Sequence, residues 1–205
     1  MNTMTDALKR AACAAIDAQA QRLTAFGRDI LAHPELGYKE TRTAGKVLEA
    51  FASLGLTDVT RPARTGVKGW LWRGAGPRVA VIGELDAVLS PGHPFADKAT
   101  GAAHACGHNA HCAMAVLAAL AMADLKDRFQ GTVYVFGTPA EEEAGAKIGM
   151  AANGAFDGMS LATMIHSWSG PASISDMDVL SLRCYLMEFK GTSAHAVAGP
   201  WEGHS

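Results

Sequence analysis

The chain has 205 residues, 49% of them hydrophobic and 19% charged, and its formal net charge is -2. That length suffices for one ordinary domain with a sizeable core, or for one domain and the start of another. The small net charge without a long run of one sign argues against a nucleic-acid partner, and no apolar stretch reaches the roughly 20 residues of a membrane span.

The first part of the chain predicts two helices and two strands. Apolar residues recur at helical spacing over residues 5–32, where no signal-peptide pattern is present, so we expect a cytoplasmic protein. They recur again over residues 41–54, and Gly55 is a natural C-terminal residue for that helix. Residues 69–72 and 78–83 predict short strands separated by a Gly- and Pro-rich turn.

The middle of the chain alternates helices with strands. An aperiodic loop over residues 90–105 precedes a helix over 109–125, a buried strand over 131–137, a helix over 146–152 and a strand over 161–165. This alternation predicts an α/β domain with a largely parallel sheet. Such sheets place their functional groups just past the carboxyl ends of the strands.

The pattern changes near residue 179 to a long β-like run over residues 182–190, followed by a Gly-Thr-Ser-Ala-His turn. We therefore expect residues 1–178 to form the N-terminal part of one domain and residues 179–205 to begin a second. Since the second domain has no element to close it, the sequence favours an open fragment.

The most informative cluster of side chains surrounds Cys106. The four cysteines are too scattered to predict a disulfide framework, whereas His104, His108 and His111 fall within eight residues of one another. Cys106 and His108 are two residues apart in an irregular segment, and a thiolate with an imidazole suits zinc or a similar first-row metal. A bare Cys-Gly-His tripeptide is nevertheless more often structural than ligating.

Carboxylates and a further histidine follow neighbouring strands and strengthen the metal hypothesis. Glu141 and Glu142 come after the buried strand at 131–137, and His166 follows the next strand. Adjacent glutamates usually form a solvated face, but at a strand end one can bind metal while the other moves protons. Asp86 can orient a ligand histidine or simply cap a turn. His195 is, on its own, typical of a surface histidine.

The ordered motifs resemble those of the M20 metallopeptidases and amidohydrolases, especially the branch of N-acyl-amino-acid and aminobenzoyl-glutamate hydrolases. The motifs are His33 to Gly37, Gly83 to Ala87, His104 to Asn109, Thr138 to Glu142 and Gly191 to Ala196. The resemblance implies a zinc-exopeptidase-like three-layer sandwich with a mostly parallel central sheet. The first strand of an α+β lid (dimerisation) domain would follow it.

The resemblance also implies roles for individual residues. Metal would be bound by Cys106, His108, Glu142 and His166, with Glu141 as general acid/base, Asp86 as the orienting carboxylate and His195 as a donor to the substrate carbonyl. The cofactor would be one or two divalent ions per subunit, zinc first, with manganese or cobalt as alternatives. The substrate would be a small N-acyl-amino acid or dipeptide, and the full-length form would be a homodimer with no nucleic-acid or membrane partner.

Two alternatives remain at this point. The family places one further metal-ligand histidine near the end of a longer chain, and this sequence has none. The first alternative is therefore a truncated, non-catalytic fragment that binds metal weakly or serves only as an association partner. The second is a nucleophilic hydrolase that uses Cys106 with His108, which leaves the paired glutamates and His166 without a role.

Overall fold

The architecture comes from a computed structural model that describes residues 3–56, 58–175, 185, 187–188 and 190–204. The chain divides into two compact units, Met1–Trp168 and Ser169–Ser205. Among the described residues, none of the helices combines the length and apolar character that crossing a bilayer requires.

Three helices open the first unit. The helix predicted over residues 5–32 is interrupted, giving α1 (Thr3–Ala18) and α2 (Ala20–Leu31). The break falls at Gln19, whose ψ of 1° lies far from the helical value, although no Gly or Pro marks it in the sequence. The second predicted helix is confirmed as α3 (Thr41–Ser53), and Gly55 beyond it has the positive φ of +72° expected of a helix C-terminus.

The central sheet has four strands in the order β1-β5-β2-β6, as expected of an α/β domain with a mostly parallel sheet. Their bounds are Val67–Arg73 for β1, Arg78–Glu84 for β2, Thr132–Thr138 for β5 and Leu161–Met164 for β6. Strand β2 pairs in parallel with both β5 and β6, whereas β1 runs antiparallel to β5 at the edge.

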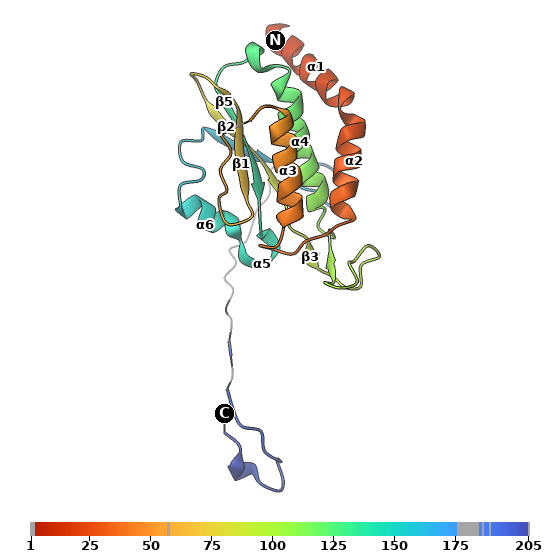
Figure 1. The fold of residues 1–205 in the computed structure, drawn as a ribbon, viewed down its shortest axis with the longest axis vertical. Coiled ribbons are helices and arrows are strands. Elements are labelled where there is room, and N and C mark those ends of the chain that lie inside the picture. Colours follow the sequence, from red (N-terminus) through yellow and green to blue (C-terminus); the bar gives the residue numbers. More distant parts are fainter. Residues whose placement is uncertain (1–2, 57, 176–184, 186, 189, 205) are drawn as a thin grey trace. The chain divides into compact units, whose positions relative to one another are not determined.

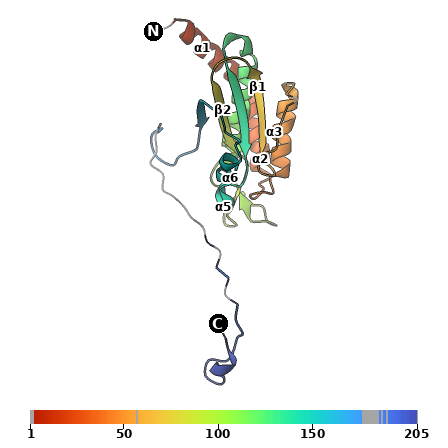
Figure 2. The ribbon, with the colours of Figure 1, turned by 90° about the vertical axis from the view of Figure 1, so that its left-hand side faces the viewer.

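Helices cover the two faces of this sheet. Helix α4 (His108–Ala123) packs with α2 and α3 on one face, where Phe51, Val116 and Val135 share one buried cluster (Figure 1). Helix α6 (Ala146–Ala152) covers the other face, where Met150 packs on Phe136. Figure 2 shows the sheet with α3 standing on one side of it. Because side chains alternate along a strand, β5 supplies both clusters, and the three-layer arrangement follows.

The segment predicted as an aperiodic loop holds a small ladder. Strands β3 (Val88–Leu89) and β4 (Ala102–Ala103) pair antiparallel, because both alanines are fully buried and their backbone groups need partners. A short helix that was not predicted, α5 (Glu141–Ala144), lies between β5 and α6. The predicted helices over 109–125 and 146–152 are confirmed as α4 and α6.

The sheet register brings the ends of three strands together. Glu84 at the end of β2 lies opposite Thr138 at the end of β5, and Ile82 lies opposite Met164 at the end of β6. The segments that carry the predicted site residues therefore leave the sheet at one edge, as expected for parallel strands.

The second unit contains an isolated bridge between Thr192 and His204 and a 3-10 turn, η2 (Pro200–Glu202). Of the strand predicted over residues 182–190, only positions 185, 187, 188 and 190 are described, and these four are not in a strand. The predicted domain boundary at 178–179 lies outside the described residues.

Candidate metal centre

The candidate site lies where the end of strand β2 meets the start of helix α4. Gly83 permits this contact, since a Cβ added there would lie 2.9 Å from Cys112 Cα and from His111 O on α4. Helix α4 begins at His108, directly after Gly107, whose φ of +87° turns the chain into the helix. The close approach brings the first turn of α4 against the end of β2.

His108 is 1% exposed, and hydrogen bonds fix its ring. Its Nδ1 donates to the main-chain oxygen of Asp86 at 2.9 Å and faces Asp86 Oδ1 at 3.3 Å. The neutral ring therefore carries its proton on Nδ1 and leaves the Nε2 lone pair free, as in a carboxylate-oriented metal ligand. Burial lowers the pKa of His108, but the Asp86 and Glu84 carboxylates outweigh it and hold that pKa above its usual value.

His111, one turn further along α4, has the opposite arrangement. Its Nε2 accepts a hydrogen bond from the Ser167 main-chain N–H at 2.8 Å. The neutral ring must then carry its proton on Nδ1, which faces Glu84 Oε2 at 3.4 Å. With its accepting nitrogen already used, His111 directs its Nδ1 N–H toward Glu84, and we infer that it supports the site without being a ligand.

His166, in the segment after β6, and Cys106, in the loop before α4, face each other. His166 Nδ1 donates to Ser167 O at 2.7 Å, so its unprotonated Nε2 accepts a hydrogen bond from the Cys106 thiol at 3.4 Å. Burial raises the pKa of the Cys106 thiol to about 12, and the nearby Glu142 carboxylate adds to the effect. The thiol becomes a thiolate ligand only beside a strong positive charge, such as a metal ion.

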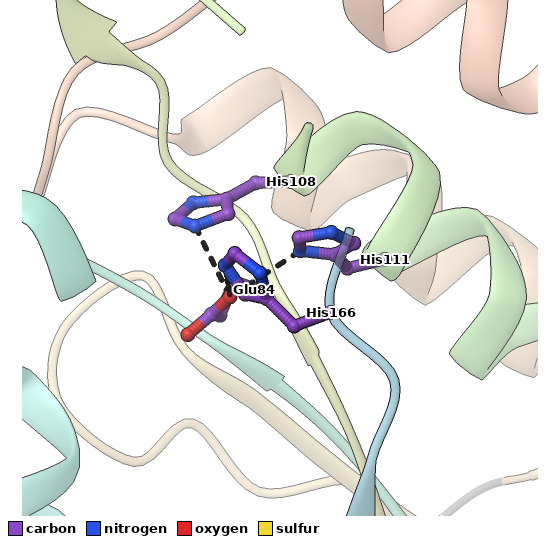
Figure 3. A group of neighbouring side chains, drawn as sticks. All are labelled: Glu84, His108, His111 and His166. Carbon is purple, nitrogen blue, oxygen red and sulfur yellow. Dashed lines mark ion pairs between the residues drawn. The ribbon is translucent and has the colours of Figure 1, made fainter. Parts of the chain in front are cut away.

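The predicted ligands come together in two overlapping groups. The ligand atoms of Cys106, His108 and Glu142 lie within 4.8 Å of one another, and so do those of Glu84, His108, His111 and His166 (Figure 3). His108 belongs to both groups, and the Cys106–His166 contact links them. The imidazole, thiol and carboxylate donors suit zinc. The buried Nε2 of His108 has no hydrogen-bond donor facing it among the described residues and lies between carboxylates, with Glu84 Oε2 at 3.1 Å, an environment that fits a cation.

Glu84 is a site residue that the sequence analysis missed. Its Oε2 lies 3.1 Å from His108 Nε2, and its Oε1 forms an ion pair with Lys147 on α6. Burial alone would raise the pKa of Glu84, but His111, Lys147 and His108 together lower it to about 2. The signal was available: Glu84 precedes Asp86 by two residues at a strand end, the spacing that puts two side chains on one face.

The turn after β5 presents Glu141 and Glu142. Asp86, fully buried, accepts a hydrogen bond from the Glu142 main-chain N–H at 2.9 Å through Oδ2, so it orients this turn as well as His108. The Glu141 side chain is 37% exposed, and burial together with the Glu84 charge raises its pKa. The pKa of Asp86 is lowered, because hydrogen bonds from His108 and from the turn outweigh its burial.

Two further histidines do not belong to these groups. His195 belongs to the second unit, where its Nδ1 accepts from the main-chain N–H groups of Val197 and Ala198, which leaves the proton on Nε2. His104 is buried, neither of its ring nitrogens has a hydrogen-bond partner within the described ranges, and burial lowers its pKa to about 4. The structure gives His104 no role in the centre.

Comparisons with known proteins point to one family. The model of peptidase family M20/M25/M40 matches residues 80–183. A mouse Xaa-Arg dipeptidase is 32% identical over 96% of this chain and 46% of its own length. An N-acyl-L-amino acid amidohydrolase of Geobacillus stearothermophilus is 33% identical over 71% of this chain and 40% of its own.

Solved structures show the same relationship. A dinuclear metal-binding peptidase of Bacillus subtilis from the M20 family superposes with a TM-score of 0.63 at 29% identity, over 71% of this chain and 42% of that one. An aminobenzoyl-glutamate utilization protein of Klebsiella pneumoniae, at 23% identity, shares the fold with a TM-score of 0.59. The chain therefore spans less than half the length of these relatives.

Proposed function

The chain belongs to peptidase family M20/M25/M40, and from this premise we propose that it carries the metal site of a hydrolase acting on small N-acyl-amino acids or dipeptides. The observation that carries the proposal is the meeting of three donors, His108 Nε2 with its free lone pair, Cys106 Sγ and Glu142, within 4.8 Å. The named activities of the mouse dipeptidase and the bacterial amidohydrolase support this substrate class.

We assign metal binding to Cys106, His108, Glu142 and His166. This mixture of sulfur, nitrogen and oxygen donors favours zinc, with manganese or cobalt as alternatives, and the site takes one or two ions per subunit. When bound, a divalent ion lowers the pKa of a water ligand and polarises the scissile carbonyl. The ligands must lose their protons to bind it, so the raised pKa of Cys106 makes binding weaker at low pH.

The remaining residues move and position protons. Glu141 takes a proton from the attacking water and returns it to the leaving amine, a task for which a carboxyl pKa raised toward neutrality is suited. Asp86 holds His108 and the Glu142 main chain in place. His195 would donate its Nε2 proton to the substrate carbonyl oxygen, where charge develops during the reaction.

The geometry disfavours Cys106 as a nucleophile. A thiol whose pKa is raised to about 12 is almost entirely protonated at neutral pH, and the protonated form is unreactive. The thiol hydrogen-bonds to His166 Nε2 at 3.4 Å, whereas the sequence had suggested His108 as the partner base.

Metal removal and replacement test the proposal. The protein is stripped with a chelator, dialysed, and reloaded with zinc, manganese or cobalt, while hydrolysis of N-acetyl-amino acids and dipeptides is followed. We expect activity to disappear with the metal and to return with at least one ion. Activity that survives complete metal removal would favour the nucleophile. Stoichiometric metal binding without turnover would make the chain a non-catalytic metal-binding fragment.

The homodimer expected of the full-length form is tested by sedimentation of the longer protein.

A further inference from the structure

Ala140 has an unusual backbone conformation at the entrance to the proposed site. Its φ of 47° and ψ of 46° place it in the left-handed region, which L-residues other than glycine, asparagine and aspartate rarely adopt. It is fully buried and directly precedes Glu141. Such a residue keeps this conformation only when its surroundings hold it there.

A buried carboxylate supplies part of that hold. Glu40, 0% exposed, lies 100 residues earlier in the chain, and its Oε1 accepts a hydrogen bond from the Ala140 main-chain N–H at 2.7 Å. Its Oε2 accepts from the Thr65 hydroxyl at 2.6 Å. Burial raises the pKa of Glu40, and these hydrogen bonds only partly oppose the rise.

Glu40 is unusual because it is buried without a cation. No Lys, Arg or His forms an ion pair with it in the part of the chain that the structure describes. Carboxylates are seldom fully buried unless paired, because their desolvation is costly. Its hydrogen-bond partners, including the Ala140 amide, are what keep it in this position.

The turn is also held by packing and at its other end. A Cβ added at Gly37, three residues before Glu40, would lie 3.1 Å from both Cα and Cβ of Ala140, so this segment presses against the turn. Two residues beyond Ala140, the Glu142 main-chain N–H donates to Asp86. Buried carboxylates thus fix the main chain on both sides of Glu141, while the Glu141 side chain itself remains partly exposed.

We propose that Glu40 is a positioning residue: its carboxylate holds Ala140 in the left-handed conformation and thereby aims Glu141 and Glu142 into the metal centre. The functional part of this inference rests on the roles proposed above for those two glutamates. The structural part, the hold on Ala140, does not depend on them.

The structural part is tested by amide hydrogen exchange of the metal-free protein. Glu40→Met keeps the side-chain length but removes both acceptors, so exchange at Ala140 should become about tenfold faster relative to Val135 in β5. Thr65→Val is the matched control, because it removes the other donor to Glu40 and leaves the Ala140 bond intact. If the methionine variant does not fold, Glu40→Leu, which also removes both acceptors, is measured in the same way. Equal Ala140 exchange in wild type and variant would overturn the proposal.

The functional part is tested with cobalt as the probe and with kinetics. In Glu40→Met we expect about tenfold weaker cobalt binding, an altered cobalt visible spectrum, and a fall in kcat with little change in KM. Adding Ala140→Gly should recover much of this loss, because glycine adopts positive φ without strain. If Glu40 only stabilised the fold, Glu40→Met would lower the Tm and leave the cobalt spectrum unchanged. Ala140→Gly would then recover neither cobalt affinity nor kcat.

The two proposals fail in distinguishable ways. A wild-type protein that binds no cobalt would contradict the proposed function, while hydrogen exchange would still decide whether Glu40 holds Ala140. A wild-type protein that binds cobalt, together with a Glu40→Met variant that matches it in cobalt affinity, spectrum and kcat, would leave the proposed function standing and overturn the role of Glu40.

Discussion

The two sides of the candidate centre are built differently. On the helix side, residues 104–111, the rings of His108 and His111 are each 1% exposed and are fixed by hydrogen bonds to main-chain groups. On the turn side, residues 140–142, the Glu141 and Glu142 side chains are 37% and 21% exposed. Only the main chain of the turn is fixed, by buried carboxylates.

This difference matches the tasks that we assign to His108 on the helix side and to Glu141 on the turn side. A metal ligand must present a lone pair in one direction, so a buried ring with a fixed tautomer suits it. A general acid/base must reach a water and then a leaving group, so a partly exposed carboxylate on a fixed backbone suits it. The predictions that follow test each side of this comparison.

The largest effect is expected on the turn side. Glu141→Gln removes the group that moves protons, so kcat should fall by about a hundred- to ten-thousand-fold. Zinc affinity should change little, because Glu141 is not among the assigned ligands. Hydrolysis rates and metal titration of the same preparation check both parts. Full activity in this variant would show that another residue is the base.

A smaller effect separates the two helix-side histidines. His108→Gln removes a ligand and should weaken zinc binding by about a hundredfold or more, whereas His111→Gln removes a supporting donor and should cost about tenfold. Competition with a chromophoric chelator measures both affinities. The tautomer argument fails if the two variants lose affinity equally, since both rings would then act as ligands.

The pH dependence of stability tests the burial of the helix side. His104 has a folded pKa of about 4 against 6.5 for a free histidine. Between these values the unfolded chain binds the proton and the folded chain does not, so stability falls as the pH drops from 6.5 toward 4. From pH 6.5 to 4.5 His104 should account for about 2 kcal/mol of the free energy of unfolding.

Denaturant unfolding of the metal-free protein and of His104→Leu at several pH values isolates this contribution. Other groups titrate in both proteins, so the quantity of interest is the difference between the two curves. As the pH falls, the free energy of unfolding of His104→Leu should exceed that of the wild type by a growing amount. Parallel curves would mean that His104 is protonated in the folded protein or accessible to water.

The smallest expected effect concerns thiol reactivity. Cys13 is exposed, whereas the thiols of Cys106 and Cys112 both have pKa values raised to about 12, mainly by burial. At pH 8 iodoacetamide should modify Cys13 about tenfold faster than either of them, because the thiolate is the reactive form. Mass spectrometry of the metal-free protein measures the rates. Fast modification of Cys106 would revive the nucleophile hypothesis.

Much of the fold could be predicted because its signals are local. Periodicity located α3, α4, α6 and the four strands of the sheet, and their alternation predicted the α/β class. The break at Gln19 and the β3-β4 ladder were not predictable in this way, since no Gly or Pro marks the first and the second depends on burial of Ala102 and Ala103. Tertiary packing determines both the helix break and the ladder, and local sequence patterns carry no information about it.

The sequence by itself determined which donors are available and that they follow strands of one sheet, since parallel strands end at a common edge. Cys106, His108, the glutamates that follow β5 and His166 could be named as candidate donors on that basis, and the family resemblance singled out Glu142. Only the tertiary structure decided how the side chains are oriented. The proton positions on His108 and His111 depend on Asp86 and Ser167, and the aim of Glu141 depends on Glu40, 100 residues from Ala140. Hydrogen bonds between residues so far apart in the sequence produce no periodic sequence pattern, because they depend on where folding brings two segments together.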